Sequence, residues 1–193
     1  MMMALGYVAS KLDGTELEFK ASQQEFPKDY LVKFNAPVVN QGSIGCCVSC
    51  AVYEMMTNFD EIRGLKYPYT YNSLYYRREN KSIDGMSPKE AFEMLKSDNL
   101  IKNYAKIGSL SVLKSSLIVN GPALIALYVR DDRRPDFWDG DDKLGGHAVA
   151  VVGFDERSLI IKNSWGKSYG NDGYGNLPYE EFNKILEVWT ILN

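Results

Sequence analysis

Hydrophobic positions just after residue 47 follow the period of a helix more clearly than anywhere else in the chain. From Val48 onward they recur at offsets of three, four, seven and eight, which is the spacing of one buried helical face. Gly64 lies where such a helix is expected to stop. The pattern therefore predicts a helix that begins at or just before Cys47. The buried face consists of Val48, Ala51, Val52, Met55, Met56, Phe59 and Ile62.

Two more helices are predicted downstream. Ser87 can cap the first of them, Pro88 suits its first turn, and Glu90 stands three residues after the serine, as in a capping box. The second runs from about residue 111 to residue 120 and ends at Gly121, which precedes a proline.

The later part of the chain changes to the pattern of strands. Apolar, partly β-branched runs cover residues 122–129 and 147–154, and a third run at 158–164 follows a short polar turn. Residues 130–146 are polar and predict a surface loop. Residues 1–40 show only weak periodicity and predict extended chain on a surface. Helices first and antiparallel strands later indicate an α+β domain with two segregated halves.

Composition and charge exclude several classes of protein. The chain has 193 residues, 45% of them hydrophobic, which is typical of one globular domain. Its net charge is −3 and its basic residues cluster only in pairs, so no nucleic-acid-binding surface is expected. No stretch is apolar over the length of a membrane span, and the first residues do not resemble a secretory signal.

The three cysteines, Cys46, Cys47 and Cys50, lie within five positions. They cannot tie distant loops together, so a reducing compartment such as the cytoplasm is expected. Cys47 and Cys50 have the spacing of half a zinc site, but the chain has one histidine and no second cysteine pair, so no metal or other cofactor is predicted. A redox pair would follow a strand rather than a glycine-rich turn. A thiol at the start of a helix is instead favoured as a thiolate nucleophile.

The single histidine, His147, is the available general base for such a nucleophile. Gly146 before it allows backbone and substrate to approach closely. If the second and third apolar runs form a hairpin, His147 and Asn163 lie nearly opposite each other at its open end. Asn163 can then accept the imidazole N–H and orient the ring, and Trp165 can shield that hydrogen bond from water. Taken singly, each of these residues could equally belong to an ordinary core.

Gln41 lies six residues before Cys47, across a turn that contains Gly42 and Gly45. Its side-chain amide could join the Cys47 backbone N–H in holding the oxyanion of a tetrahedral intermediate. A glutamine before a glycine-rich turn is usually a solvated loop residue, so this role depends on the residues around it.

Three segments of the chain resemble the signature blocks of papain/cathepsin-type cysteine peptidases, in the order of that family. They read NQGSIGCCVSCA, GGHAVAVVGFD and IIKNSWGKSYGNDGYGNLPYEEF. The resemblance covers about residues 27–193 and is to the bacterial and phage branch of the family. It implies that Cys47 is the nucleophile, His147 the general base and acid, Asn163 its orienting partner and Gln41 the oxyanion donor.

The same resemblance implies an architecture. The fold would be α+β and papain-like, a single domain over residues 1–193 with an N-terminal extension at about 1–26. A mainly helical lobe at about 27–110 would carry a central helix that starts at the nucleophile. An antiparallel β-barrel-like lobe at about 111–193 would face it across the active-site cleft.

Departures from the family pattern point to its branch and setting. Cys46 replaces a usual serine or alanine, and Val48 replaces a usual aromatic residue. Ile44 stands where secreted relatives have a disulfide cysteine, in keeping with the cytoplasm of a bacterium or a virus-infected host cell. The gap of 100 residues between Cys47 and His147 is short and predicts trimmed loops. Only 46 residues precede Cys47, so we expect a protein made without a large pro-segment.

The leading hypothesis is a papain-like thiol peptidase that hydrolyses peptide bonds through an acyl-enzyme on Cys47. Its partner would be a protein or peptide, and Gly85, Gly146 and Trp165 would line the path of that substrate. An acyltransferase or a glutamine deamidase could use the same triad, because the substrate is chosen by loops. The third hypothesis is a catalytically inactive binding protein, against which the intact set of candidate residues argues.

Overall fold

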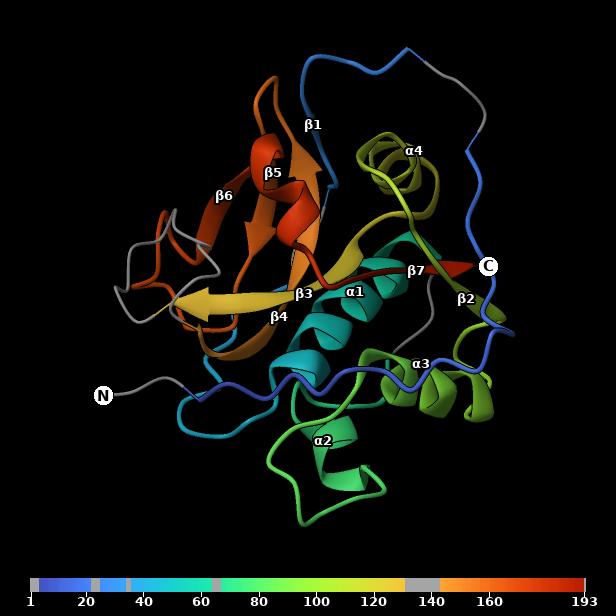
Figure 1. Cartoon of the computed structure of the whole chain (residues 1–193), viewed down its shortest axis with the longest axis vertical. Helices are drawn as coiled ribbons and strands as arrows, with labels where there is room; N and C mark the ends of the chain where they lie inside the picture. The colour runs from blue at the N-terminus through green and yellow to red at the C-terminus, as the bar shows by residue number, and fades with distance from the viewer. Residues whose placement is uncertain (1–3, 22–24, 34–35, 64–66, 131–142, 193) are drawn as a thin grey trace.

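The computed structural model describes residues 4–21, 25–33, 36–63, 67–130 and 143–192. Helices dominate the first half of this chain and strands the second (Figure 1). In chain order the elements are β1 (Tyr30–Leu31), α1 (Cys47–Arg63), α2 (Ser73–Arg77), α3 (Pro88–Ser97), β2 (Asn103–Lys106), α4 (Leu110–Asn120), β3 (Ala123–Arg130), β4 (Lys143–Phe154), β5 (Ser158–Lys162), β6 (Tyr174–Pro178), the 3₁₀ turn η1 (Tyr179–Lys184) and β7 (Glu187–Leu192).

The first predicted helix is α1, and it begins at Cys47 itself. The members of its apolar stripe from Val48 to Met56 are buried, as the helical period predicts. The predicted stripe side chains of Phe59 and Ile62, and the predicted stop Gly64, lie outside the described part of the chain. The stripe therefore sets Cys47 at the N-terminus of a buried helix.

The start signal of the second predicted helix is confirmed in part. The Ser87 hydroxyl accepts a hydrogen bond from the Glu90 N–H at 3.2 Å, so Ser87 caps α3 as expected. The prediction of a complete capping box is wrong, because the Glu90 carboxylate does not turn back to Ser87. It accepts a hydrogen bond from the Glu79 N–H at 2.7 Å instead. The third predicted helix is present as α4, whose start matches to within one residue.

The strands form one antiparallel sheet in the order β2-β7-β3-β4-β5-β6, with β1 paired to β4 beside this path. The barrel-like lobe expected from the resemblance is therefore wrong: within the described residues the sheet is open, with β2 and β6 at its ends. β4 begins at Lys143, earlier than the predicted His147, because its pairing with β3 continues as far as Arg130. The predicted loop at 130–146 is correspondingly shorter, and its residues 131–142 lie outside the described part.

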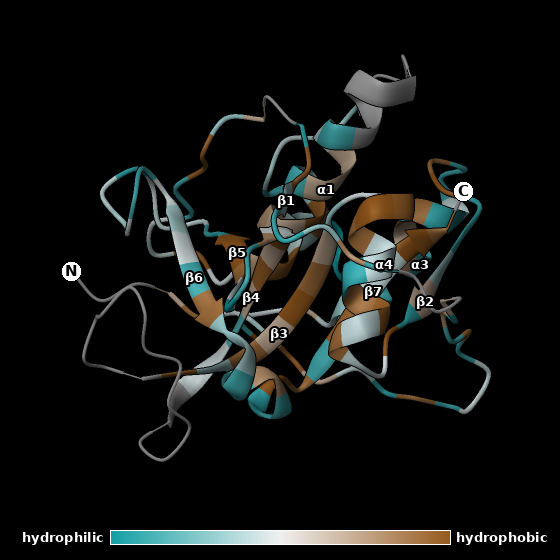
Figure 2. Cartoon of the chain, turned by 90° about the horizontal axis from the view of Figure 1, so that it is seen from above, coloured by the Kyte–Doolittle hydropathy of each residue, from teal (hydrophilic) through white to brown (hydrophobic). Residues whose placement is uncertain are grey.

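The sheet separates two hydrophobic cores, since successive side chains along a strand point to opposite faces. On one face, Leu124 of β3 and Ala148 of β4 pack with α1 and α3. On the other, Ile125 and Val149 pack with α4. β3 is hydrophobic along most of its length, as a strand covered on both faces must be (Figure 2). The two halves of the molecule therefore meet along α1 and β4, the elements that carry the predicted nucleophile and base.

Residues 4–10 follow an extended path between the sheet and the helical half, over the start of α1 (Figure 1). We call them the N-terminal strap. The strap contains no helix or named strand, and its one bridge is a parallel pairing of Tyr7 with Met86. The prediction of extended chain before residue 40 is confirmed for the described residues, but the surface that this chain covers includes the junction of the two halves.

Candidate active site

Cys47 is the first residue of α1, and its side chain is completely buried. The backbone N–H groups of Gly6, Val48 and Ala148 point toward its sulfur. These donors favour the thiolate, but burial outweighs them and raises the pKa of the Cys47 thiol to about 12. In this form of the protein, Cys47 is a neutral thiol.

His147 lies beside that thiol, because the next residue of β4 is Ala148, whose N–H points at the sulfur. Its Nε2 atom is 2.9 Å from Asn163 Oδ1. Since an amide oxygen can only accept, Nε2 carries the proton and Nδ1 is the basic nitrogen. Burial lowers the pKa of His147 to about 4, against the opposing effect of the Asn163 hydrogen bond. The thiol and the imidazole are thus both neutral here.

Asn163 reaches His147 by a different route from the predicted one. β5 ends at Lys162, which pairs with Ala150, so the same register continued outward would set His147 opposite Trp165. Trp165 does stack on the imidazole, with ring centroids 4.7 Å apart and planes inclined by 23°. The expected near-opposite pairing of His147 and Asn163 is therefore wrong in register, although the two side chains are in contact as predicted.

Gln41 is buried, and its side-chain amide is fixed at both ends. Its Oε1 accepts a hydrogen bond from the Ser164 hydroxyl at 2.5 Å, which ties it to the residue after Asn163. Its Nε2 donates to the Ile44 carbonyl at 2.9 Å and to the Ala4 carbonyl at 3.0 Å. Both N–H groups of the amide are therefore occupied, one of them by the Ala4 carbonyl of the strap, so an oxyanion could take that place only after the strap has left.

The strap is held to both halves of the molecule by backbone hydrogen bonds. The Tyr7 N–H donates to the Gly146 carbonyl of β4 at 3.2 Å. On the helical side, the Val8 N–H donates to the Met86 carbonyl and the Met86 N–H donates to the Gly6 carbonyl, each at 3.0 Å. These contacts close the strap over the thiol and the imidazole. They were not predicted from the sequence.

The strap passes close to the thiol, because Gly6 presents its N–H to the Cys47 sulfur. The close approach requires glycine, because a Cβ on Gly6 would lie 1.8 Å from the Gly45 carbonyl oxygen. The strap therefore covers the site, where Cys47 and His147 are both shielded from water.

Gly85, Gly146 and Trp165, the residues expected to line the substrate path, differ in how they meet the strap. A Cβ on Gly146 would lie 2.3 Å from Tyr7 Cδ1, and one on Gly85 would lie 2.6 Å from the Gly6 carbonyl oxygen. Trp165 instead stacks on the imidazole. Met86, the residue after Gly85, makes the backbone hydrogen bonds to the strap. Both glycines nevertheless border the chain that crosses the site.

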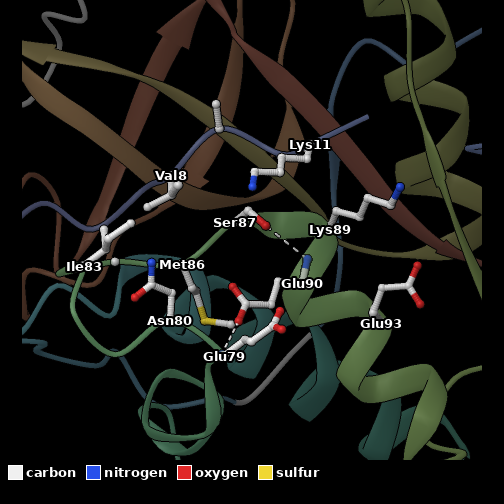
Figure 3. A pocket seen from close by; sticks show the side chains of 12 residues that line it. Val8, Lys11, Glu79, Asn80, Ile83, Met86, Ser87, Lys89, Glu90 and Glu93 are labelled. Carbon is white, nitrogen blue, oxygen red and sulfur yellow. Dashed lines mark hydrogen bonds between the residues drawn. The ribbon is translucent and has the colours of Figure 1, made fainter. Parts of the chain in front are cut away.

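A pocket of about 390 Å³ continues the path of the strap beyond Tyr7 (Figure 3). Val8 and Lys11 line it on the side of the N-terminal segment, and Ile83 and Glu90 line it on the helical side. An extended chain that followed the strap's path would have room for side chains there.

The two other cysteines contact each other. The Cys46 and Cys50 sulfur atoms are 3.6 Å apart, and both side chains are completely buried. Cys50 is part of the core that packs α1 and α3 against the sheet.

The described ranges of the chain contain no group of three or more His, Cys, Asp or Glu side chains that could hold a metal ion. No helix among them is long and apolar enough to cross a membrane.

A thiol at a helix N-terminus and an imidazole beside it that an amide orients form the arrangement of a cysteine hydrolase. The chain belongs to the papain family of cysteine proteases, whose sequence pattern matches residues 15–186.

Curated relatives match parts of the chain. A viral cathepsin of Cydia pomonella granulosis virus is 31% identical over 112 residues, which are 53% of this chain and 31% of that protein. An uncharacterized peptidase C1-like protein of Acanthamoeba polyphaga mimivirus is 43% identical over 56 residues, which are 26% of this chain and 18% of that protein. Each match spans less than a third of the relative's own length.

Solved structures resemble the whole fold. Xylellain, a cysteine protease from Xylella fastidiosa, has a TM-score of 0.85 at 19% identity, over 98% of this chain and 96% of that chain. Digestive procathepsin L 3 of Tenebrio molitor larval midgut has a TM-score of 0.77 at 17% identity, over 95% of this chain and 76% of that one. The predicted papain-like α+β fold is confirmed.

Proposed function

We propose that the protein hydrolyses peptide bonds in protein or peptide substrates, with Cys47 as the nucleophile. The carrying observation is the 2.9 Å contact of His147 Nε2 with Asn163 Oδ1, beside a thiol at the start of α1. This contact leaves Nδ1 free of its own proton and turns the imidazole into a base for the thiol.

The reaction uses each group in turn. His147 takes the thiol proton, the Cys47 sulfur attacks the peptide carbonyl carbon, and the Gln41 amide with the Cys47 N–H stabilises the oxyanion. His147 then gives its proton to the leaving amine. Finally His147 deprotonates a water molecule that attacks the acyl-enzyme, which releases the acid and restores the thiol. Asn163 keeps the ring in the required orientation throughout.

On this proposal, the protein is inactive as long as the strap covers Cys47 and His147. Burial is the largest cause of both pKa shifts, upward at Cys47 and downward at His147, so it opposes the thiolate–imidazolium pair. When the strap leaves, water returns and the ion pair becomes accessible. The chain must therefore open at residues 4–10 before it can act on another protein.

A reducing compartment, such as the cytoplasm of a bacterium or a virus-infected cell, suits this chemistry. The nucleophile must remain a thiol, and the Cys46 and Cys50 sulfurs are near enough to react with each other under oxidation.

The test compares the full chain with its Cys47→Ala variant on unfolded casein, followed by mass spectrometry, and labels both with an epoxide thiol reagent. We expect the wild type to cut casein and to carry the label on Cys47, and the variant to do neither. The Cys46→Ser chain is the matched control, since it removes the neighbouring thiol and should keep both properties. Cleavage that survives in Cys47→Ala contradicts the proposal, and a wild type that deamidates or acylates casein without cutting it supports the alternative functions.

A further inference from the structure

Two thiols other than the nucleophile face each other at the start of α1. The Cys46 and Cys50 sulfur atoms are 3.6 Å apart, and both side chains are completely buried. Cys46 directly precedes the helix, and its carbonyl accepts a hydrogen bond from the Cys50 N–H at 2.9 Å. The pair therefore spans the same turn of chain that carries Cys47.

The two thiols differ in how readily each loses its proton. The hydrogen bond between them is the largest cause that lowers the pKa of Cys46. Burial is the largest cause that raises the pKa of Cys50, and the same hydrogen bond raises it further. Cys46 is therefore the more acidic thiol, and Cys50 keeps its proton beside it. A thiol that ionises next to a second thiol is well placed to close a disulfide.

The geometry points to a redox-sensitive site. We propose that a small-molecule disulfide such as glutathione disulfide oxidises Cys46 and Cys50 to a disulfide, and that this bond inactivates Cys47. The Cys46 thiolate attacks one sulfur of the reagent, whose S–S bond breaks and releases one thiol. The Cys50 sulfur then attacks the Cys46 sulfur and displaces the second thiol. The protein loses two hydrogen atoms, and the reagent gains them.

The new bond moves the backbone next to the nucleophile. A disulfide needs Cβ atoms about 3.5–4.5 Å apart, whereas residues four apart on a helix have Cβ atoms about 5–6 Å apart. Cys50 is held by the hydrogen bonds of α1, and Cys46 lies outside the helix. The tightening therefore shifts Cys46 and the peptide that joins it to Cys47. A misplacement of about 1 Å in a reacting group can slow a reaction about a hundredfold.

The strap controls access to the pair as well as to Cys47. Gly6 lies against the Gly45 carbonyl, directly before Cys46. When the strap leaves, that peptide is uncovered, so the open form is the one that an oxidant attacks. Formation of the bond does not depend on the proposed function. The loss of activity does, since it concerns the same nucleophile.

The first experiment detects the bond in a chain without the nucleophile. The Cys47→Ala protein has Cys46 and Cys50 as its only cysteines. It is treated with glutathione disulfide, alone and with Tyr7→Ala added to open the strap. We expect the mass to fall by two hydrogen atoms, with no glutathione attached and no thiol left for iodoacetamide, and a reductant to reverse the change. Adding Cys50→Ser is the matched control, which should abolish this loss.

The second experiment measures what the bond does to the nucleophile. Tyr7→Ala with Cys47 intact is oxidised in the same way, and the molecules that lost two hydrogen atoms without gaining glutathione are separated. We expect their casein cleavage and their epoxide labelling at Cys47 to be about tenfold to a hundredfold slower than in the reduced protein, and to recover with reductant. The reduced Cys50→Ser variant should cleave casein as fast as its parent.

Three outcomes overturn the inference. The first is that Cys46 and Cys50 of the Cys47→Ala, Tyr7→Ala protein stay free or keep glutathione. The second is an oxidised protein as active as the reduced one. The third is a loss of two hydrogen atoms that persists in Cys50→Ser with Cys47 intact, since the bond would then join Cys46 to Cys47. Casein cleavage by the reduced protein keeps the proposed function in each case, and its absence overturns that function whatever the mass experiment shows.

Discussion

The candidate catalytic groups and the strap above them are built in opposite ways. Cys47, His147 and Asn163 are completely buried and stand on α1, on β4 and directly after β5. Of the strap residues only Gly6 is buried, and the strap as a whole is tied down by backbone hydrogen bonds and the side chain of Tyr7.

This difference indicates that the site is preorganised and that its cover is separable. Segments with few buried apolar contacts open at a much lower free energy than core helices and strands. The strap can therefore leave while the sheet and α1 keep Cys47, His147 and Asn163 in register. Substitutions that weaken the strap should alter how fast reagents reach the Cys47 thiol. Substitutions of the groups beneath the strap should alter the free energy of unfolding.

The largest expected effect comes from Tyr7→Ala. It removes the half-buried ring and its hydrogen bond to Glu187, so the strap should open more often. A hydrogen bond to a charged group contributes roughly 1.5–3 kcal/mol and each ~1.4 kcal/mol is tenfold, so Tyr7→Phe, which loses only this bond, should speed alkylation of Cys47 by iodoacetamide at least about tenfold. Tyr7→Ala also loses the contacts of the ring, so its rate should be about a hundredfold or more above that of the wild type. Equal rates in all three proteins would show that Tyr7 does not hold the strap.

Gly6→Ala should have the next largest effect, by a different route. The added methyl group would lie 1.8 Å from the Gly45 carbonyl oxygen, so the strap could not seat over Cys47. Overpacking of about 1–3 kcal/mol predicts roughly tenfold to hundredfold faster alkylation of the thiol. Gly108→Ala is the matched control, because no atom lies within 4 Å of a Cβ at that position. Unchanged alkylation in Gly6→Ala would contradict the seating of the strap.

Below the strap, Asn163→Ala should lower the free energy of unfolding by about 1–3 kcal/mol. The change leaves the buried N–H groups of His147 and Ser164 without the oxygen that accepts both. Urea unfolding measures the loss. Asn163→Asp, which keeps an acceptor at this position, should recover part of it, and a wild-type midpoint in the alanine variant would contradict the assigned role of the amide.

The smallest effect expected is on the pH dependence of stability. The pKa of His147 is about 4 in the folded chain, below its ordinary value of 6.5. The unfolded chain therefore takes up the proton first, and stability should fall as the pH drops from 6.5 toward 4. For this one group, the loss between about pH 7 and about pH 5 is about 2 kcal/mol. The measurement is urea unfolding at both pH values in the wild type and in His147→Gln. The variant should lack the part of the decrease in unfolding free energy that comes from His147.

Periodicity predicted the position of the thiol, because the buried face of a helix repeats along the chain. It predicted Cys47 as the start of α1, and the residue types at 87, 88 and 90 predicted Ser87 as the cap of α3. The contact between His147 and Asn163 was predictable for the same reason, from two strands joined by a short turn. Its register was not predicted correctly, because alternation along two strands does not fix which residues are opposite: the pairing of Ala150 with Lys162, continued outward, sets His147 opposite Trp165 rather than Asn163.

The strap and the open sheet could not be predicted, because both depend on contacts between distant segments. Backbone hydrogen bonds such as those of the strap do not require any pattern of side chains. Gly6, which lies against the Gly45 carbonyl, is compatible with such a contact but does not predict it. Tyr7 and Glu187 are 180 positions apart, and a lone glutamate before an apolar strand is ordinary in a sequence. Closure of the sheet depends on whether β2 and β6 meet, which alternation along either strand does not determine.

The central claim is that the Cys47 thiol of a peptidase lies beneath a removable strap. The most direct measurement is the initial rate of casein cleavage by three full-length proteins: the wild type, Tyr7→Ala, and Tyr7→Ala combined with Cys47→Ala. The account predicts faster cleavage by Tyr7→Ala than by the wild type, and none by the double variant. Cleavage by the double variant, or a Tyr7→Ala rate no higher than that of the wild type, would contradict it.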